Sequence, residues 1–339
     1  MLEESTTPLI EAHDLVMFDL DGVVYVGGEA IDGVAGVIDR VRLSGRHVAF
    51  VTNNASRTPD QVAAKLSKVG VSADAGDVVT SAQAAARLLV EEHGEGARVL
   101  MLGGEGLRVA LLEAGLEPVE DPAGAVAVAS GYGPDVRWRD IMRVATLVQD
   151  GLPYVASNAD LTIPTPYGLA PGHGVLVRTI TGFAGVDATV AGKPEKPLME
   201  ETVLRVGGDR PLMVGDRLDT DIEGAHAIGA PSLLVLTGVT WLEELAAARP
   251  RLRPTYVSPT LAGLFDPHPV PAVSGATAEL GGWHATVDDG RLRVEGEGSD
   301  GDWWRAAATA CWIHLDEAGA TADVSDTTPP GPVRQLGAE

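Results

Sequence analysis

The sequence predicts an α/β protein that has a Rossmann-like parallel sheet, an inserted α/β cap domain and a small C-terminal α+β domain. Three observations support this fold class. Short apolar segments alternate with helical patterns as far as about residue 265, which is typical of a parallel sheet with helices on both faces. Residues 82–185 carry strands and helices of their own. A proline-rich stretch then precedes a tryptophan-bearing tail.

The individual elements follow from hydrophobic period and end signals. Thr58 is the expected N-cap of a helix with Pro59 in its first turn, and Gly70 is expected to end that helix. Gly45 closes an earlier helical pattern in the same way. The predicted helices of this part are 34–45, 58–70 and 81–94. Apolar runs predict strands at 14–20, 47–53, 98–104, 125–132, 154–158, 188–192, 211–216 and 231–238.

The expected domain boundaries come from where the polar motifs lie. Those motifs all fall outside 82–185, so we expect this segment to be inserted into a discontinuous core. The tail predicts a hairpin that turns at Asp289-Gly290 and a helix over 302–319. The predicted organisation is a core of 1–81 and 186–265, a cap of 82–185, a linker of 266–274, a small domain of 275–325 and a flexible tail of 326–339.

Composition restricts the partners. The chain has 339 residues, 45% apolar content and a formal net charge of −23, which argues against nucleic acid and anionic membranes as main partners. The acidic N-terminus lacks the features of a signal peptide, and no apolar run is long enough to cross a bilayer. Cys311 is the single cysteine, so no intramolecular disulfide forms. We therefore expect a cytoplasmic protein.

Two carboxylates stand at the end of the first apolar strand. Asp19 and Asp21 are two residues apart, so both can face one cleft at the carboxyl end of a parallel sheet. Two close carboxylates repel each other, and a divalent cation removes that repulsion. Oxygen ligands of this kind suit Mg²⁺. The alternative from these residues alone is a capped turn with two solvated aspartates.

Polar residues follow two more strands. Thr52, Asn53 and Asn54 come after the second strand, where a hydroxyl and turn amides can hold phosphate oxygens or simply shape a turn. Lys193 follows a later strand and offers a positive charge to a phosphate or a carboxylate. Lys196 is the competing lysine, although it lies farther from the strand end.

A third group of acids follows the strand at 211–216. Asp216 comes directly after Gly215, and Asp219 and Asp221 follow it closely. Helix capping explains one acid near a helix N-terminus but not three. The order of motifs along the chain is therefore Asp-x-Asp, Thr, Lys and Gly-Asp.

These four motifs resemble those of the haloacid dehalogenase (HAD) phosphatase superfamily, over residues 14 to about 265. The resemblance implies that the parallel sheet is a HAD core. The long insertion and the stretches VTNNAS, AGKPEKP and GDRLDTDI are similar to class IIA, the 4-nitrophenylphosphatase-like branch with a type 2 cap. The full length is similar to an actinobacterial member described as a glycerol 3-phosphate phosphatase. The implied activity is Mg²⁺-dependent hydrolysis of a small phosphate monoester.

The resemblance also implies roles for the acids. Asp19 attacks phosphorus and forms an aspartyl-phosphate, while Asp21 is the general acid and then the general base. Mg²⁺ is held by the Asp19 carboxylate, the backbone carbonyl of Asp21 and Asp216, with Asp221 supporting that shell through water. The implied phosphate ligands are Thr52, Lys193 and the backbone amides of Asn53 and Asn54.

The leaving alcohol is expected to be chosen by the cap. The resemblance implies that segment 157–174 faces the substrate, with Tyr167 and His173 as the first side chains to test, although both can also serve only to pack the loop. Members of this branch often pair through the cap, so a homo-oligomer is possible. The resemblance favours glycerol 3-phosphate as the substrate, and pyridoxal phosphate, phosphoglycolate and nucleotide monophosphates are the alternatives.

Three other activities are weighed against a phosphatase. A dehalogenase needs no second acid, so Asp21 argues against it. A phosphomutase would use the same motifs, but the branch resemblance does not support one. A metabolite sensor with a residual phosphatase domain is opposed by the intact set of Asp19, Asp21, Lys193 and Asp216.

Overall fold

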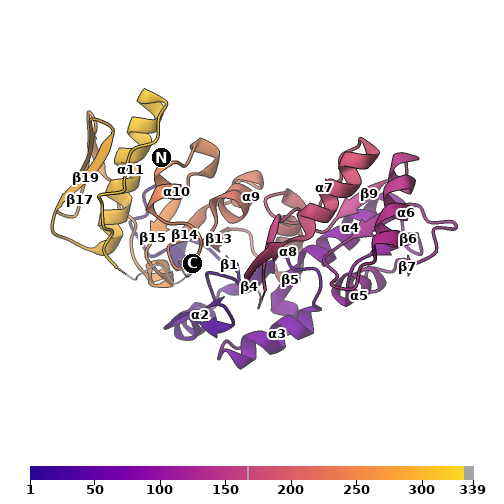
Figure 1. Ribbon diagram of the computed structural model, residues 1–339. Helices are drawn as coiled ribbons and strands as arrows, with labels where there is room; N and C mark the ends of the chain where they lie inside the picture. The colour runs from indigo at the N-terminus through magenta and orange to yellow at the C-terminus, as the bar shows by residue number, and fades with distance from the viewer. Residues whose placement is uncertain (166–167, 332–339) are drawn as a thin grey trace. The chain divides into compact units, whose positions relative to one another are not determined.

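The computed structural model describes residues 1–165 and 168–331, and it forms two compact units. The first unit joins Met1–Val48 to the residues from Gly207 onward, and the second is Ala49–Val206. Among the described residues, no helix combines the length and apolar character needed to span a bilayer. Figure 1 shows the helices and strands of the chain in order of colour.

The first unit contains a parallel sheet with strand order β15-β14-β13-β1. Its strands are buried along almost their whole length, as predicted for a sheet covered on both faces. The strands are β1 (Leu15–Phe18), β13 (Pro211–Gly215), β14 (Ser232–Val235) and β15 (Tyr256–Ser258), and a small hairpin adds β2 (Tyr25–Val26) and β3 (Glu29–Ala30). The helices here are α1 (Leu9–Ala12), α2 (Val34–Leu43), α9 (Glu223–Ala227) and α10 (Leu242–Ala246), with short helical turns η2 (Leu218–Ile222), η3 (Pro250–Leu252) and η4 (Leu261–Phe265).

The C-terminal part of this unit is an antiparallel sheet with one long helix beside it (Figure 1). Its elements are β16 (Ala272–Ser274), β17 (Thr277–Leu280), β18 (Trp283–Asp288), β19 (Arg291–Gly296) and α11 (Asp300–Ala318). The predicted hairpin turn is confirmed, because Asp289 and Gly290 both have positive φ between paired strands. Strand β16 occupies the end of the proline-rich stretch, which the sequence did not indicate.

Helix α11 is buried nearly all round because it packs on two sides. One side contacts β17–β19 and the other contacts α10 and β15. Trp303, Trp304 and Trp312 are each less than 5% exposed, as expected for a helix without a broad polar face. The Trp312 indole donates to the Leu245 carbonyl at 2.7 Å. This helix is therefore joined to the parallel-sheet region by an apolar interface.

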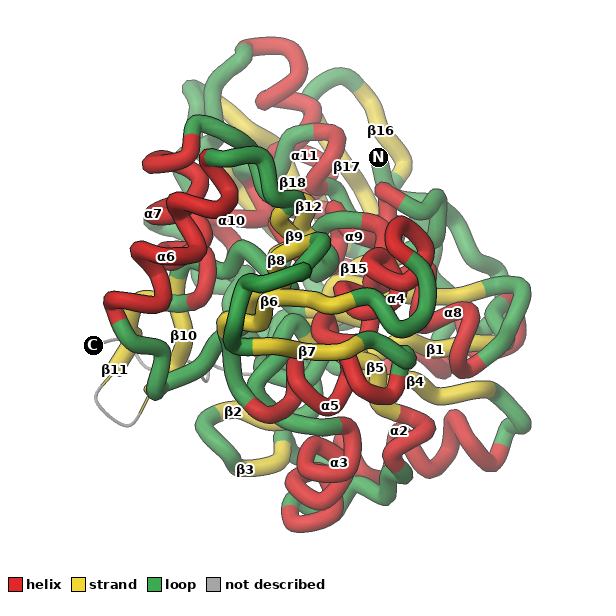
Figure 2. The backbone as a smooth tube through the Cα atoms, turned by 90° about the vertical axis from the view of Figure 1, so that its right-hand side faces the viewer, coloured by secondary structure: helices red, strands yellow, loops and turns green. Residues whose placement is uncertain are grey.

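The second unit contains two parallel arrangements of strands. Strand β4 (His47–Thr52) pairs with β5 (Val78–Thr80), and a separate sheet has the order β12-β9-β8-β6-β7 (Figure 2). The strands of that sheet are β6 (Arg98–Leu102), β7 (Glu117–Val119), β8 (Ala127–Ser130), β9 (Tyr154–Ala156) and β12 (Thr189–Val190). A hairpin of β10 (Thr162–Thr165) and β11 (Gly168–Pro171) follows β9. The sequence did not predict β5, β7, β10, β11 or β15.

The helices of the second unit begin where the sequence places capping residues. The Thr58 hydroxyl accepts from the Gln61 amide, and Thr80 and Gln83 repeat that capping box at the start of the next helix. The helices are α3 (Pro59–Lys68), α4 (Ser81–His93), α5 (Glu105–Glu113), α6 (Trp138–Gln149), α7 (His173–Ala184) and α8 (Lys196–Val206), with the short turn η1 (Ala75–Asp77). Helices α6 and α7 lie side by side (Figure 2).

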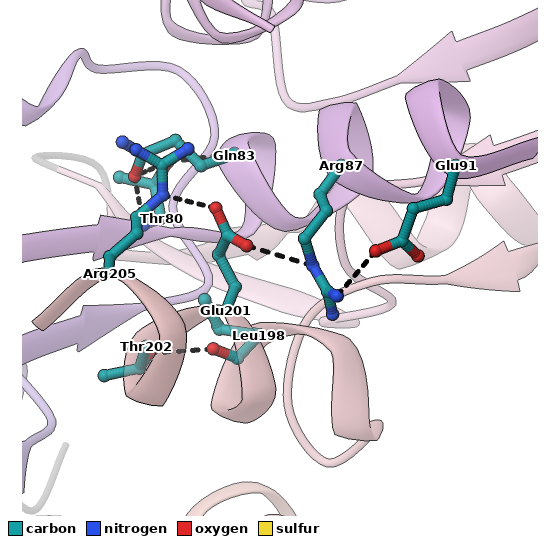
Figure 3. Close-up of polar contacts among 8 residues, drawn as sticks. All are labelled: Thr80, Gln83, Arg87, Glu91, Leu198, Glu201, Thr202 and Arg205. Atoms are coloured by element: carbon teal, nitrogen blue, oxygen red, sulfur yellow. Dashed lines mark hydrogen bonds and ion pairs between the residues drawn. The ribbon is translucent and has the colours of Figure 1, made fainter. Parts of the chain in front are cut away.

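A buried carboxylate joins α4 to α8. Glu201 on α8 is 3% exposed and forms ion pairs with Arg87 of α4, at 2.9 Å, and with Arg205 one turn along α8 (Figure 3). Arg87 also contacts the exposed Glu91 at 2.8 Å. Helix α8 begins at Lys196, three residues after Lys193, so the pair of Glu201 with Arg87 connects α4 to the helix that comes next in the chain after Lys193.

Candidate active site

The loop after β1 carries Asp19 and Asp21. The Asp19 amide still donates to the Val214 carbonyl at 2.9 Å, so Asp19 continues the β1–β13 ladder. The chain then turns tightly, with the Gly22 amide donating to the Tyr25 carbonyl at 2.9 Å. Gly22 has a φ of +85°, and a methyl group there would collide with the Asp216 carboxylate. The glycine of the Asp-x-Asp-Gly motif is therefore required by backbone conformation and by the nearby acid.

Asp216 and Asp221 are both completely buried after β13. The Asp221 Oδ2 accepts from the amides of Asp216 and Arg217, at 3.2 and 3.1 Å. The Asp216 Oδ2 accepts from the Val239 amide at 2.6 Å, while its Oδ1 is buried without a hydrogen-bond partner among the described residues. This is the atom that a missing ligand would be expected to contact.

Three carboxylates converge in the first unit. One carboxylate oxygen each from Asp19, Asp216 and Asp221 lies within 4.8 Å of the other two. Burial raises the pKa of Asp216 well above its usual value, and repulsion from Asp221 and Asp19 raises it further. A set of hard oxygen ligands around one orphaned buried oxygen fits a cation such as Mg²⁺.

The structure separates the acids that the sequence grouped. Arg217 forms a two-point ion pair with Asp219, at 3.0 and 2.8 Å, and the Asp219 carboxylate is 64% exposed, so it does not belong to the cluster. Asp21 has an exposed side chain and is absent from the cluster of carboxylates. The resemblance implies that Asp21 contributes its backbone carbonyl to the metal, so its side chain need not belong to the cluster.

Thr52 and Asn54 form a compact turn at the end of β4. The Thr52 hydroxyl is nearly buried and accepts from the Asn54 amide at 3.1 Å. The Asn54 Oδ1 accepts from the Ser56 and Arg57 amides at 2.9 and 3.2 Å. The Asn54 amide, expected to bind phosphate, is thus occupied by a hydroxyl in this structure.

Lys193 and Lys196 differ in burial. Lys193 is 3% exposed, and its Nζ donates to the Val51 carbonyl at 3.3 Å, near the end of β4. Lys196 is an exposed residue at the start of α8. Asn53 contacts the Lys193 backbone twice, since its Oδ1 accepts from the Lys193 amide and its Nδ2 donates to the Lys193 carbonyl. Lys193 is therefore the lysine that lies with the strand-end residues.

His173 is buried at the start of α7, and Tyr167 lies outside the described residues. The His173 Nε2 is 3.0 Å from the Ser130 hydroxyl, which is 2.8 Å from the Tyr154 hydroxyl. Burial lowers the pKa of His173 to about 4 and raises the pKa of Tyr154, so both are uncharged near neutral pH. Sequence reasoning missed Ser130 and Tyr154, which belong to strands and carry no motif.

The fold and the acidic cluster together are those of α/β enzymes that work on phosphate groups with a divalent cation. Comparison with known families agrees. A haloacid dehalogenase-like hydrolase model matches residues 16–117, and a second HAD-hydrolase-like model matches residues 190–264. The chain is 41% identical over 316 residues to a D-glycerol 3-phosphate phosphatase of Mycobacterium tuberculosis, covering 90% of this chain and 87% of the relative.

Other relatives are also phosphatases. An acid sugar phosphatase of Staphylococcus aureus is 37% identical over 250 residues, covering 73% of this chain and 95% of the relative. The crystal structure of the M. tuberculosis glycerol phosphate phosphatase in complex with magnesium has a TM-score of 0.83 and 40% identity, covering 91% of this chain and 92% of that one. A thermostable NPPase of Geobacillus stearothermophilus has a TM-score of 0.68 and 33% identity, with coverages of 74% and 96%.

The chain therefore belongs to the haloacid dehalogenase-like hydrolase family. The predicted fold class, the resemblance to the phosphatases of that family and the expectation of a phosphoric monoester hydrolase are confirmed. None of the relatives described above is named as a dehalogenase.

Proposed function

We propose that this protein hydrolyses glycerol 3-phosphate with Mg²⁺. The observation that carries the proposal is the extent of the similarity to the M. tuberculosis enzyme, which covers 90% of the chain. A stretch of that length in 339 residues cannot end before residue 300, so the similarity must enter the C-terminal region. The sugar phosphatase similarity covers 73% of the chain and needs no such extension.

The acids have distinct roles in this mechanism. An Asp19 carboxylate oxygen attacks phosphorus, the bond from phosphorus to the ester oxygen breaks, and Asp21 gives its proton to the departing alcohol. Asp21 then takes a proton from a water molecule that attacks the Asp19 phosphoester, which releases inorganic phosphate and regenerates the Asp19 carboxylate. The exposed side chain of Asp21, outside the buried cluster, supports its role as a proton carrier.

The cation would be held by Asp19, Asp216 and the backbone carbonyl of Asp21, with Asp221 behind them. When bound, it supplies positive charge that offsets the carboxylates and the phosphoryl group. The burial of Asp221 and the convergence of one of its carboxylate oxygens with those of Asp19 and Asp216 support this assignment.

The substrate phosphate would be bound by residues of the second unit. We assign Thr52, Lys193 and the backbone amides of Asn53 and Asn54 to the phosphoryl oxygens, because phosphoryl transfer depends chiefly on positioning and charge compensation. Tyr167 and His173 stay candidates for selecting the alcohol. The burial of His173 supports an indirect contribution, through the segment that it anchors.

Two further expectations are part of this proposal. We place the protein in the cytoplasm, which is supported by its single, buried cysteine. A homo-oligomer formed through the cap stays a prediction. Sedimentation of the purified chain at several concentrations measures that state directly.

A substrate panel tests the proposed function. Phosphate release is measured with Mg²⁺ from both enantiomers of glycerol 3-phosphate, and from phosphoglycolate, pyridoxal phosphate, AMP and a hexose phosphate. We expect kcat/KM to be highest for glycerol 3-phosphate and Asp19→Asn to be inactive with every ester. A preference for the hexose phosphate would favour the function of the staphylococcal relative. No turnover of any ester would favour a sensor.

A further inference from the structure

The carboxamide of Asn53 has an orientation fixed by its partners. Its Oδ1 accepts from the Lys193 amide at 2.8 Å, and its Nδ2 donates both to the Lys193 carbonyl at 3.0 Å and to the Asp160 carboxylate at 3.1 Å. An amide turned the other way would bring its oxygen against two acceptors. Asn53 therefore uses one acceptor and two donors, which only a carboxamide supplies.

The surrounding residues are shaped for this contact. A methyl group on Gly192 would lie 2.6 Å from the Asn53 Oδ1. Only glycine at position 192 therefore lets the Asn53 side chain approach the backbone there this closely. Asn158 donates to the Asn53 carbonyl at 2.7 Å and accepts from the Asp160 amide at 3.2 Å. Asn53, Asn54 and Asn158 are all the asparagines that the chain contains, and all belong to this region.

Asp160 connects this network to the start of α7. Its carbonyl accepts from the Gly174 amide at 2.8 Å. Methyl groups on Gly172 or Gly174 would collide with the carbonyls of Asp160 and Ala159. The glycines that flank His173 are thus required because the chain packs closely on residues 159 and 160. The Asp160 carboxylate in turn accepts a hydrogen bond from the Asn53 side chain.

We propose that the Asn53 side chain is a positioning residue that fixes Lys193 and links its position to segment 157–174. This inference rests on the proposed role of Lys193 in binding the phosphoryl group. It gives Asn53 a side-chain role distinct from the backbone role expected from the sequence. Asp160 contacts the Asn53 carboxamide and Asn158 contacts the Asn53 carbonyl, so residues 158 and 160 both connect to the residue that holds Lys193.

The test uses Asn53→Asp, which keeps the size and the acceptor but removes both donors. The introduced carboxylate faces the Lys193 carbonyl and the Asp160 carboxylate, so we expect kcat/KM for the best ester to fall about 10- to 100-fold. Gly192→Ala places a methyl group 2.6 Å from the Asn53 Oδ1 and 2.7 Å from the Ser157 carbonyl, so it should also lower kcat/KM. Gln83→Glu is the matched control, because the structure uses only the Gln83 side-chain oxygen, and its activity should be unchanged.

A double variant separates direct contact from general damage. When Asn53→Asp is combined with Asp160→Asn, the carboxamide introduced at position 160 can donate to the carboxylate introduced at position 53. Activity should then recover to within about tenfold of the wild type. A double variant no more active than Asn53→Asp overturns the proposed link to Asp160. Wild-type activity in both Asn53→Asp and Gly192→Ala overturns the positioning role.

Hydrogen exchange keeps this inference separate from the proposed function. In the intact protein with Mg²⁺, backbone exchange in a peptide spanning 191–199 should be faster in Asn53→Asp than in the wild type or Gln83→Glu. Unchanged exchange overturns the inference even if activity falls. If the wild type hydrolyses no ester while exchange responds as expected, the proposed function fails and the contact between Asn53 and Lys193 stands.

Discussion

The two polar clusters of this molecule balance their charges in different ways. In the first unit, Asp19, Asp216 and Asp221 bring like charges together, and a buried Asp216 oxygen has no hydrogen-bond donor among the described residues. In the second unit, Asn53 and Asn158 have their polar atoms matched by complementary partners. We therefore expect the acidic cluster to need a bound cation, whereas the side chains of the amide network already have partners within the chain.

The difference indicates what each cluster is built to do. Buried carboxylates without counter-charges cost free energy, so a site of this kind gains stability when its ligand binds. A satisfied amide network holds geometry whether or not a ligand is present. The predictions below test whether binding and stability divide between the two clusters in this way.

The largest effect is expected at Asp216. Asp216→Asn removes a carboxylate that we propose as a metal ligand, but the new side chain can still accept from the Val239 amide. Because the cation should bind poorly, we expect kcat/KM to fall by about 1,000-fold or more. Mg²⁺ should raise the Tm of the wild type and leave that of the variant unchanged, as measured by calorimetry with Mg²⁺ and with EDTA.

The same experiment predicts that the order of the two Tm values depends on Mg²⁺, which a general loss of stability would not produce. In EDTA the variant should melt above the wild type, since one of three repelling carboxylates is gone. Asp219→Asn is the matched control, because its carboxylate pairs with Arg217 at the surface, and it should keep the full response to Mg²⁺. A wild-type Tm that ignores Mg²⁺ would contradict the idea of an incomplete acidic cluster.

The sequence predicted much of the fold and of the acidic cluster because both depend on local signals. Uniformly apolar strands and capping residues such as Thr58 act over a few residues, and the acids of the motifs follow strand ends. What it could not assign depends on distant partners. Asp219 and Asp221 look alike in sequence, but Arg217 holds one at the surface and backbone amides hold the other inside.

The amide network shows the same limit. The sequence predicted a backbone role for Asn53, but its side-chain partners lie 107 and 140 residues away. His173 was singled out by its loop, and only the folded structure brings it to Ser130. Strand β16 and the hairpin β10–β11 are short, and no apolar alternation marks them.

A smaller effect is expected at Glu201, where the second unit does bury a charge but supplies its own counter-charges (Figure 3). Glu201→Gln leaves Arg87 and Arg205 without their buried partner, so the free energy of unfolding should fall by about 2–3 kcal/mol. Mg²⁺ should stabilise this variant as much as the wild type. Denaturant titrations with and without Mg²⁺ measure both quantities.

The matched control for Glu201 lies on the same arginine. Glu91 is 55% exposed and contacts Arg87 at 2.8 Å, so Glu91→Gln should cost no more than about 0.5 kcal/mol. Equal losses in the two variants would show that burial does not decide the strength of these pairs. A loss of Mg²⁺ response in Glu201→Gln would break the division of roles between the two clusters.

The smallest effect is a pH dependence of the free energy of unfolding that comes from His173, a buried neutral side chain of the second unit that contacts the Ser130 hydroxyl. Burial lowers its pKa to about 4 from 6.5, so between these values the unfolded chain binds more protons and stability falls as pH falls. By pH 5 the loss is about 2 kcal/mol. Unfolding free energies at pH 7.5 and 5 should therefore differ by that much less in His173→Gln than in the wild type. Burial also lowers the pKa values of His13 and His268, but both residues are present in the two proteins, so their contributions cancel in the difference. Parallel pH profiles of the two proteins would mean that His173 is not a buried neutral group.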